Sequence, residues 1–84
     1  MGLSIKVKDV KPLNDMKLMV LFENNVNKLY DVRQLINEYP IYCELENEVL
    51  FKTVRVDSGG YAVAWNEDID ISEVELWENG NPIA

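Results

Sequence analysis

The chain has 84 residues, of which 48% are hydrophobic, and its formal net charge at pH 7 is −7. It contains no histidine and a single cysteine, Cys43, which excludes catalysis by a histidine base, zinc sites built from histidines or several thiolates, and an internal disulfide. A chain of this length is one domain, residues 1–84, with a small hydrophobic core. Its longest apolar runs have the length of strands, so we expect no membrane span, no signal peptide and a cytoplasmic location.

The acidic residues are concentrated in the second half of the chain. Residues 1–42 contain 6 basic and 5 acidic residues, whereas residues 43–84 contain 2 basic and 10 acidic residues. A region with a net charge of −8 is repelled by nucleic acid phosphates and is attracted to a basic protein surface. We therefore expect no direct binding to nucleic acid. The acids either face a protein partner or simply keep a small protein soluble.

The first part of the chain predicts three antiparallel strands. Residues 4–10 and 16–22 alternate apolar and polar side chains, as half-buried strands do, and Pro12 predicts a break between them because proline cannot donate to a strand ladder. The pair Asn24–Asn25 tolerates a positive φ and predicts a tight turn before a third strand at 26–30. The side chains expected to point into the core are Ile5, Val7, Val10, Met16, Leu18, Val20 and Phe22.

A helix is predicted to follow, from Asp31 to Pro40. Asp31 and Gln34 have the spacing of a capping box, and Pro40 would end the helix. Its apolar face would consist of Val32, Leu35, Ile36 and Tyr39. Beyond it we expect a short helical turn at 41–45, a connection at 46–48, and a buried apolar group of Val49, Leu50 and Phe51.

Two further strands are predicted around a glycine turn. Residues 52–56 would place Val54 and Val56 inward, and the sequence Asp-Ser-Gly-Gly at 57–60 supplies glycines for positive φ. Residues 61–65 alternate large and small side chains. This alternation predicts a core face of Tyr61, Val63 and Trp65 and an opposite face of Ala62 and Ala64.

A capped helix is predicted to close the chain. Ser72 is the expected N-cap, and Glu75, three residues later, completes a second capping box. Gly80 and Pro82 would end the helix. Glu73, like Glu75, lies in the first turn, where the helix dipole favours negative charge. The apolar side of the helix would consist of Val74, Leu76 and Trp77.

Asp68 and Asp70 precede this helix without such a local explanation, and they are candidates for binding. Together with Ser72 they have the spacing of the first three ligands of a calcium loop, but the required turn glycine is absent and Asn79 replaces the final glutamate. The Ser-Gly-Gly sequence lacks the lysine of a phosphate-binding loop. We therefore expect no metal ion, no cofactor and no catalytic residue.

The order of these pieces resembles a known family. The segments VKPLNDMKLMVLFENN, LYDVRQLI and LFKTVRVDSGGYAVAWNEDIDISEVELWENG are similar to the bacterial domain-of-unknown-function family 2442 (DUF2442). The resemblance implies a small α+β domain without an established activity, and a likeness to presumed antitoxins of two-gene modules. Some members are fused to a helix-turn-helix domain; none is expected here, so any link to DNA would be indirect. Where the family usually has proline at the start of the last helix, this chain has Glu73.

The predicted fold is therefore α+β and two-layered, with one antiparallel sheet covered on one face. Its predicted order is strand, strand, strand, helix, strand, strand, helix, with a short extra helical turn. The leading hypothesis is a non-enzymatic cytoplasmic protein-binding module, an antitoxin-like partner of a small basic protein. The alternatives are an accessory domain of a transcriptional regulator that works as a homodimer, and a ligand-sensing domain. The residues expected to contact the partner are Glu67, Asp68, Asp70, Glu73, Glu78 and, unless it belongs to the core, Trp77.

Overall fold

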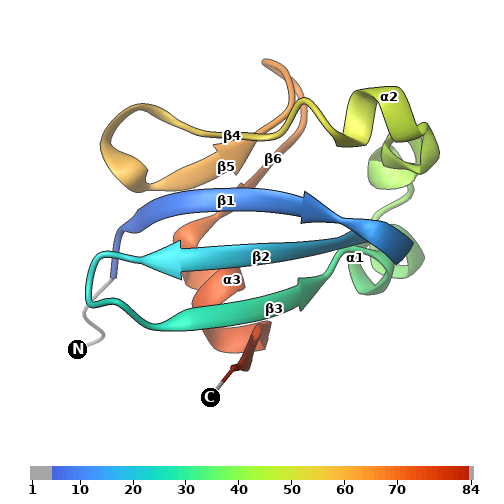
Figure 1. The fold of residues 1–84 in the computed structure, drawn as a ribbon. Coiled ribbons are helices and arrows are strands. Elements are labelled where there is room, and N and C mark those ends of the chain that lie inside the picture. The colour runs from blue at the N-terminus through green and yellow to red at the C-terminus, as the bar shows by residue number, and fades with distance from the viewer. Residues whose placement is uncertain (1–4, 84) are drawn as a thin grey trace.

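The computed structural model describes residues 5–83 and confirms an α+β fold (Figure 1). The strands are β1 (Val7–Leu13), β2 (Lys17–Phe22), β3 (Asn27–Asp31), β4 (Arg55–Val56), β5 (Ala62–Ala64), β6 (Asp70–Ser72) and β7 (Asn81–Pro82). The helices are α1 (Arg33–Glu38), α2 (Glu48–Phe51) and α3 (Glu73–Asn79). The part of the chain that the structure describes also contains three short 3-10 helices: η1 (Asn14–Met16), η2 (Pro40–Glu46) and η3 (Ser58–Gly60).

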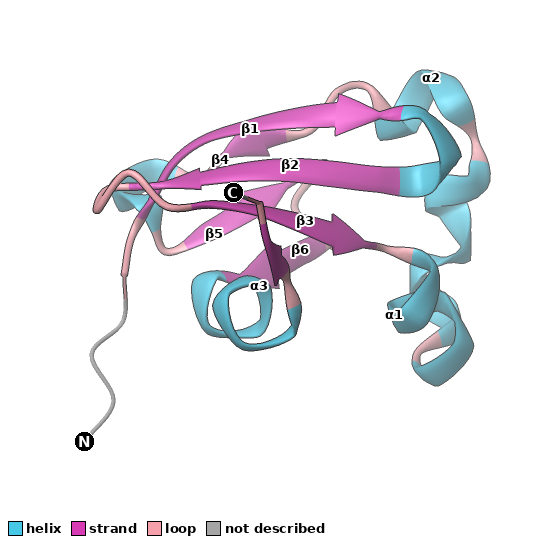
Figure 2. Ribbon diagram, turned by 60° about the horizontal axis from the view of Figure 1, so that its bottom comes forward, coloured by secondary structure: helices cyan, strands magenta, loops and turns pink. Residues whose placement is uncertain are grey.

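The strands form two antiparallel sheets, where the sequence predicted one. The first sheet has the order β1-β2-β3-β7 and the second has the order β4-β5-β6. Residues 70–72, expected only to lead into the last helix, form β6 and pair with β5, while β7 returns to β3 after α3. The second sheet and α3 lie on the same side of the first sheet (Figure 2). This sheet is thus covered on one face.

The expected break at Pro12 is wrong, because β1 continues to Leu13 with Pro12 opposite Leu18. The strand tolerates proline since β1 is an edge of its sheet, where the missing N–H needs no partner. A register shift between Val7 and Asp9 indicates a β-bulge. The bulge allows both Val7 and Val10 to be buried although they are three residues apart.

The middle of the chain follows the sequence prediction with three differences. Tyr39, expected on the apolar face of the helix, is 54% exposed, because α1 ends at Glu38 and the backbone of Tyr39 is extended. The predicted capping box of Asp31 and Gln34 is wrong: the Asp31 carboxylate accepts a hydrogen bond from the Arg33 N–H at 2.9 Å, two residues on, and the regular helix begins only at Arg33. The helical turn expected after Pro40 is present as η2. Val49 was expected to be buried with Phe51, and it is instead 78% exposed. The reason is that α2 is a single turn that directs Phe51 inward and Val49 outward.

The glycine turn is confirmed, since Gly59 and Gly60 have φ values of 87° and 81°. The strand that follows is shorter than expected and begins at Ala62. Tyr61 therefore does not share the core face: its side chain is 54% exposed, with the Lys6 ammonium 5.0 Å from its ring centroid. All three residues of β5 are buried, because this strand lies between β4 and β6.

The closing helix has the predicted N-cap, Ser72, but the Glu75 carboxylate of the predicted capping box accepts a hydrogen bond from the Tyr30 hydroxyl of the first sheet. The Ser72 hydroxyl accepts a hydrogen bond from the Glu75 N–H at 3.2 Å, and Gly80 follows the last turn. Leu76 is buried, whereas Val74, expected on the same apolar side, is exposed. The reason is that α3 presents only a narrow face to β3 and β6, with which it makes its main contacts.

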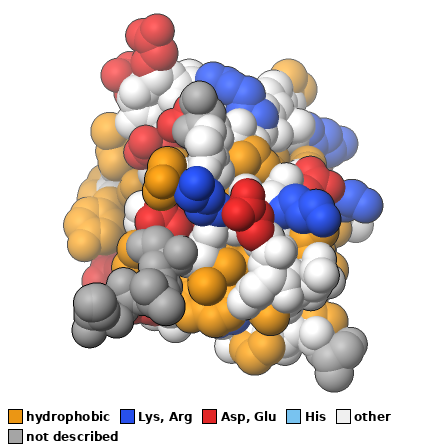
Figure 3. Space-filling view, turned by 90° about the vertical axis from the view of Figure 1, so that its left-hand side faces the viewer, with side chains coloured by type: hydrophobic (Ala, Val, Ile, Leu, Met, Phe, Trp, Pro, Cys, Tyr) orange, Lys and Arg blue, Asp and Glu red, His pale blue; other side chains and the backbone are white. Residues whose placement is uncertain are grey.

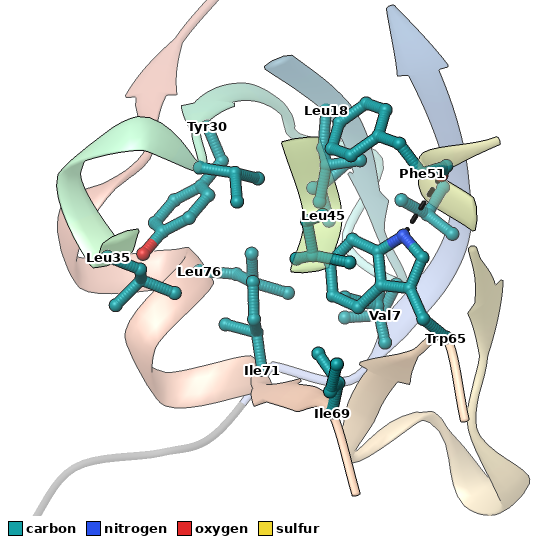
Figure 4. Packing of buried hydrophobic residues seen from close by; sticks show 14 of the residues in the cluster. Val7, Leu18, Tyr30, Leu35, Leu45, Phe51, Trp65, Ile69, Ile71 and Leu76 are labelled. Atoms are coloured by element: carbon teal, nitrogen blue, oxygen red, sulfur yellow. Dashed lines mark hydrogen bonds between the residues drawn. The ribbon is translucent and has the colours of Figure 1, made fainter. Parts of the chain in front are cut away.

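The hydrophobic core lies between the two sheets and is closed by helices at one end (Figure 4). Trp65 is almost fully buried, and its indole N–H donates to the backbone carbonyl of Phe51 at 2.9 Å. This hydrogen bond, drawn as a dashed line in Figure 4, joins the second sheet to α2. The other core residues labelled there are Val7, Leu18, Tyr30, Leu35, Leu45, Ile69, Ile71 and Leu76.

Candidate functional site

Four of the six residues predicted to contact a partner are exposed: Glu67, Asp68, Asp70 and Glu78. Glu67 and Asp68 lie in the loop between β5 and β6, Asp70 begins β6, and Glu78 lies near the end of α3. In Figure 1 this loop lies at the top of the molecule and α3 lies low behind β2 and β3. The structure therefore does not gather these acids in one patch.

The loop between β5 and β6 is held in a fixed shape. The Asn66 side-chain oxygen accepts hydrogen bonds from the N–H groups of Asp68 at 2.8 Å and Ile69 at 2.9 Å. The Trp65 N–H donates to the Ile69 carbonyl at 3.0 Å, and the Ile69 side chain is buried in the core. Glu67 and Asp68 are thus displayed at the tip of an anchored turn.

Two of the predicted contact residues are engaged within the protein. Glu73 is only 8% exposed, so its side chain contributes little to the surface. Trp77 packs edge-on against Phe22, with ring centroids 5.0 Å apart. The Lys28 ammonium lies 3.8 Å from the Trp77 ring centroid and also donates to the Trp77 carbonyl. Trp77 therefore packs between α3 and the first sheet, as expected if it belongs to the core.

A buried polar pair, which the sequence did not predict, also joins α3 to the first sheet. The fully buried Tyr30 donates from its hydroxyl to a carboxylate oxygen of Glu75 at 2.7 Å. Burial raises the pKa of Tyr30 far above its usual value of 10.0, and the hydrogen bond to Glu75 raises it further. The two residues are 45 positions apart in sequence. The sequence could therefore suggest only that Tyr30 points into the core, not that it contacts Glu75.

The wild-type protein is expected to lose stability at high pH because of Tyr30, and the Tyr30→Phe variant should lack this loss. Above a pH of about 10 an unfolded tyrosine loses its proton, whereas the folded Tyr30 keeps it. The free energy of unfolding should therefore fall by up to about 1.4 kcal/mol per pH unit from this group alone. Urea unfolding of both proteins between pH 8 and about 11.5 checks this, since the two proteins differ in this one titratable group. Equal slopes for the wild type and Tyr30→Phe would contradict it.

A groove at the opposite end from the β2–β3 turn lies over buried core residues. Its volume is about 510 Å³, and it lies between η1 on one side and η2 with α2 on the other. The lining residues are Leu13, Asn14, Asp15, Met16, Leu45, Glu46, Glu48, Phe51 and Lys52. We call this the η1–α2 groove. Sequence reasoning treated residues 46–48 only as a connection and missed it.

The backbone that forms one wall of the η1–α2 groove has an unusual conformation. Asp15 and Met16 are consecutive non-glycine residues with positive φ, 63° and 58°. The Val32 N–H donates to the Met16 carbonyl at 3.0 Å, and Arg33 lies 3.9 Å from the Asp15 carboxylate. These contacts with the start of α1 hold the wall in place. The arrangement can accept an apolar side chain, and its carboxylates can pair with a cation.

Within residues 5–83, no group of three or more cysteine, aspartate or glutamate side chains is placed to hold a metal ion. None of the helices described here has both the length and the apolar character needed to cross a membrane.

A family model with the description "Protein of unknown function (DUF2442)" matches residues 7–82. No curated protein and no solved structure matches the chain.

Proposed function

The chain belongs to DUF2442, a family of proteins of unknown function, and from its surface we propose that it is a non-enzymatic, cytoplasmic protein-binding module. Its partner would be a small basic protein that it binds in the manner of an antitoxin. The family gives no activity or site residue to build on, so the proposal depends on how the fold displays its charges.

The observation that carries this proposal is the exposure of the acidic residues in the second half of the chain. Eight of the ten acids among residues 43–84 are exposed, and one is buried. Of the two basic residues in this half, Arg55 donates to the Trp65 carbonyl at 3.2 Å. Exposed carboxylates in this number attract a basic surface over long range and so accelerate encounter.

The experiment that tests the proposal is capture of the partner from the native cell. The protein is tagged at its C-terminus, and the eluted species are identified by mass. We expect one small basic protein, near one-to-one with the bait, that is released at high salt. Recovery of the bait alone, or of a partner whose binding is insensitive to salt, would contradict the proposal.

Asp68, in the β5–β6 loop, and Asp70, at the start of β6, are expected to increase the rate of encounter with the partner. Replacing Asp68 and Asp70 together by asparagine should slow association with the captured partner and flatten its dependence on salt, while dissociation changes little. The two side chains are exposed, so the fold should tolerate the change. Stopped-flow or surface-based kinetics at several salt concentrations measure this. An association rate equal to that of the wild type would remove the loop from the proposal.

A second candidate function is favoured by the outer face of the first sheet. Leu18, Val20 and Phe22 of β2 point into the core, so Met19 and Leu21 point to the other face, which no helix covers in Figure 2. Both are only partly buried. Such a face could pair two copies of the chain, as in a homodimeric accessory domain of a transcriptional regulator. A mass that rises with protein concentration in sedimentation would support this alternative.

A further inference from the structure

We propose that the η1–α2 groove is the surface on which the basic partner docks, and that it receives an apolar side chain flanked by lysine or arginine. This inference rests on the proposed function, because it names the contact surface for the partner proposed there. It differs from the sequence prediction, which placed the contacts on β6, α3 and the loop before them.

The groove offers apolar surface at Leu13 and Met16, which lie over the core residues Leu45 and Phe51. Leu45 and Phe51 are buried, and the Phe51 ring lies 6.0 Å from the Trp65 ring (Figure 4). Leu13, at the rim, is 38% exposed, and Met16 is partly buried. An apolar side chain that entered the groove would remove this surface from water, and the flexible Met16 side chain could adapt to its shape.

The charges at the rim determine which kind of partner fits. The lining contains three carboxylates, from Asp15, Glu46 and Glu48, and one ammonium, from Lys52. An acidic segment would be repelled, and a purely apolar one would take carboxylates out of water without a partner. A segment that combines an apolar side chain with cations satisfies both the apolar surface and the carboxylates of the groove. The groove therefore selects a basic segment with an apolar anchor.

The α2 side of the groove is rigid, so binding would require little ordering of the chain. The Asn47 side chain accepts hydrogen bonds from the N–H groups of Val49 at 2.9 Å and Leu50 at 3.3 Å, which caps α2 at its start. The Thr53 hydroxyl donates to the Leu50 carbonyl at 2.7 Å beyond its end. A preformed surface loses less conformational entropy on binding.

Other surfaces of the molecule match a basic partner less well. Figure 3 shows the end opposite the groove, where Lys and Arg side chains lie among Asp and Glu side chains. A small hollow on the outer face of the first sheet, of about 110 Å³, is lined by both Asp9 and Lys11. Both surfaces mix acidic and basic side chains, so neither would attract a basic segment as the carboxylates of the groove do.

The first test titrates the full-length, nitrogen-15-labelled protein with a short synthetic peptide that carries one leucine between lysines and arginines. Two control peptides replace the leucine by serine, or the basic residues by glutamate. We expect amide shifts at 13–16 and 45–52 with the first peptide, and shifts at least about fivefold smaller with either control. Shifts elsewhere, equal shifts with the controls, or no shifts at all would overturn the inference.

The second test uses the partner captured from the cell and separates this inference from the proposed function. Glu46→Gln with Glu48→Gln, and separately Leu13→Ser, are expected to raise the dissociation constant about tenfold through faster dissociation. The paired variant Asp68→Asn with Asp70→Asn removes the same number of charges outside the groove. It is expected to slow association and to leave the dissociation rate unchanged, so the dissociation rate is the readout that separates it from the groove variants. If only Asp68→Asn with Asp70→Asn weakened binding, the groove would be wrong while the proposed function stood. If no basic partner were captured, the proposed function itself would fail.

Discussion

The Trp65→Ala variant is expected to be strongly destabilised and to unfold at a much lower denaturant concentration than the wild type. Removing a buried tryptophan costs about 3–5 kcal/mol through lost burial and the cavity that remains. The change also leaves the Phe51 carbonyl without the indole donor that it has in the native protein. A domain of 84 residues has a total stability of roughly 4–12 kcal/mol, so this single loss is a large part of it.

Chemical unfolding followed by circular dichroism measures this effect. Trp65→Phe is the matched control, because it keeps an aromatic ring in the core and removes the indole N–H. We expect it to lose about 1–3 kcal/mol, mainly for the unsatisfied carbonyl of Phe51. A loss below about 1 kcal/mol for Trp65→Ala would show that Trp65 is not the joint between the second sheet and α2.

The Gly60→Ala variant is expected to have the second largest effect. A side-chain carbon at Gly60 would meet the Val7 carbonyl oxygen at 2.8 Å and the Lys6 side chain at 3.1 Å, and the residue has a φ of 81°. The positive φ costs an alanine about 1–2 kcal/mol, and forcing β1 away from the turn adds about 1–3 kcal/mol.

Gly59→Ala is the matched control for this prediction. Gly59 has a similar φ of 87°, but a side-chain carbon there would meet only the exposed ring of Tyr61, at 3.2 Å. The ring can move, so this variant should lose only the roughly 1–2 kcal/mol due to φ. Thermal or urea unfolding of both variants compares them. Equal losses would mean that the approach of Val7 to the turn is not tight.

The parts of the fold that could be predicted are those determined by local chemistry. A cap needs only a hydroxyl and an N–H three residues away, so Ser72 was identified from sequence. Asn25 and the glycines of the second turn have the positive φ that their residue types indicated. Alternation over six residues placed Leu18, Val20 and Phe22 in the core correctly.

The parts that could not be predicted depend on tertiary contacts. Strands β4, β6 and β7 have only two or three residues each, which is too short for an alternating pattern to be visible. Pro12 is compatible with β1 only because that strand lies at an edge, and an edge position cannot be read from the strand itself. Tyr61 was misplaced because its strand begins one residue later than the alternation suggested.

The candidate site was harder to predict than the fold. Sequence identified an acidic half, but exposure and position depend on packing: Glu73 is buried, and Trp77 is held by Phe22 and Lys28. The η1–α2 groove joins residues 13–16 to residues 45–52, and no local pattern relates two segments so far apart. The acidic charge of the second half could therefore be predicted from the sequence, whereas the location of the groove could be found only from the structure.

The measurement that tests the central claim most directly is the dissociation constant of the captured complex as a function of salt, for the wild type and for Glu46→Gln with Glu48→Gln. Fluorescence anisotropy over about 0.05–0.5 M sodium chloride covers the range in which surface charges become screened. We expect the wild-type dissociation constant to rise steeply with salt, and the variant to bind about tenfold more weakly at low salt with a shallower dependence. A dissociation constant that is independent of salt and equal in the two proteins would contradict both the acidic binding surface and its location in the groove.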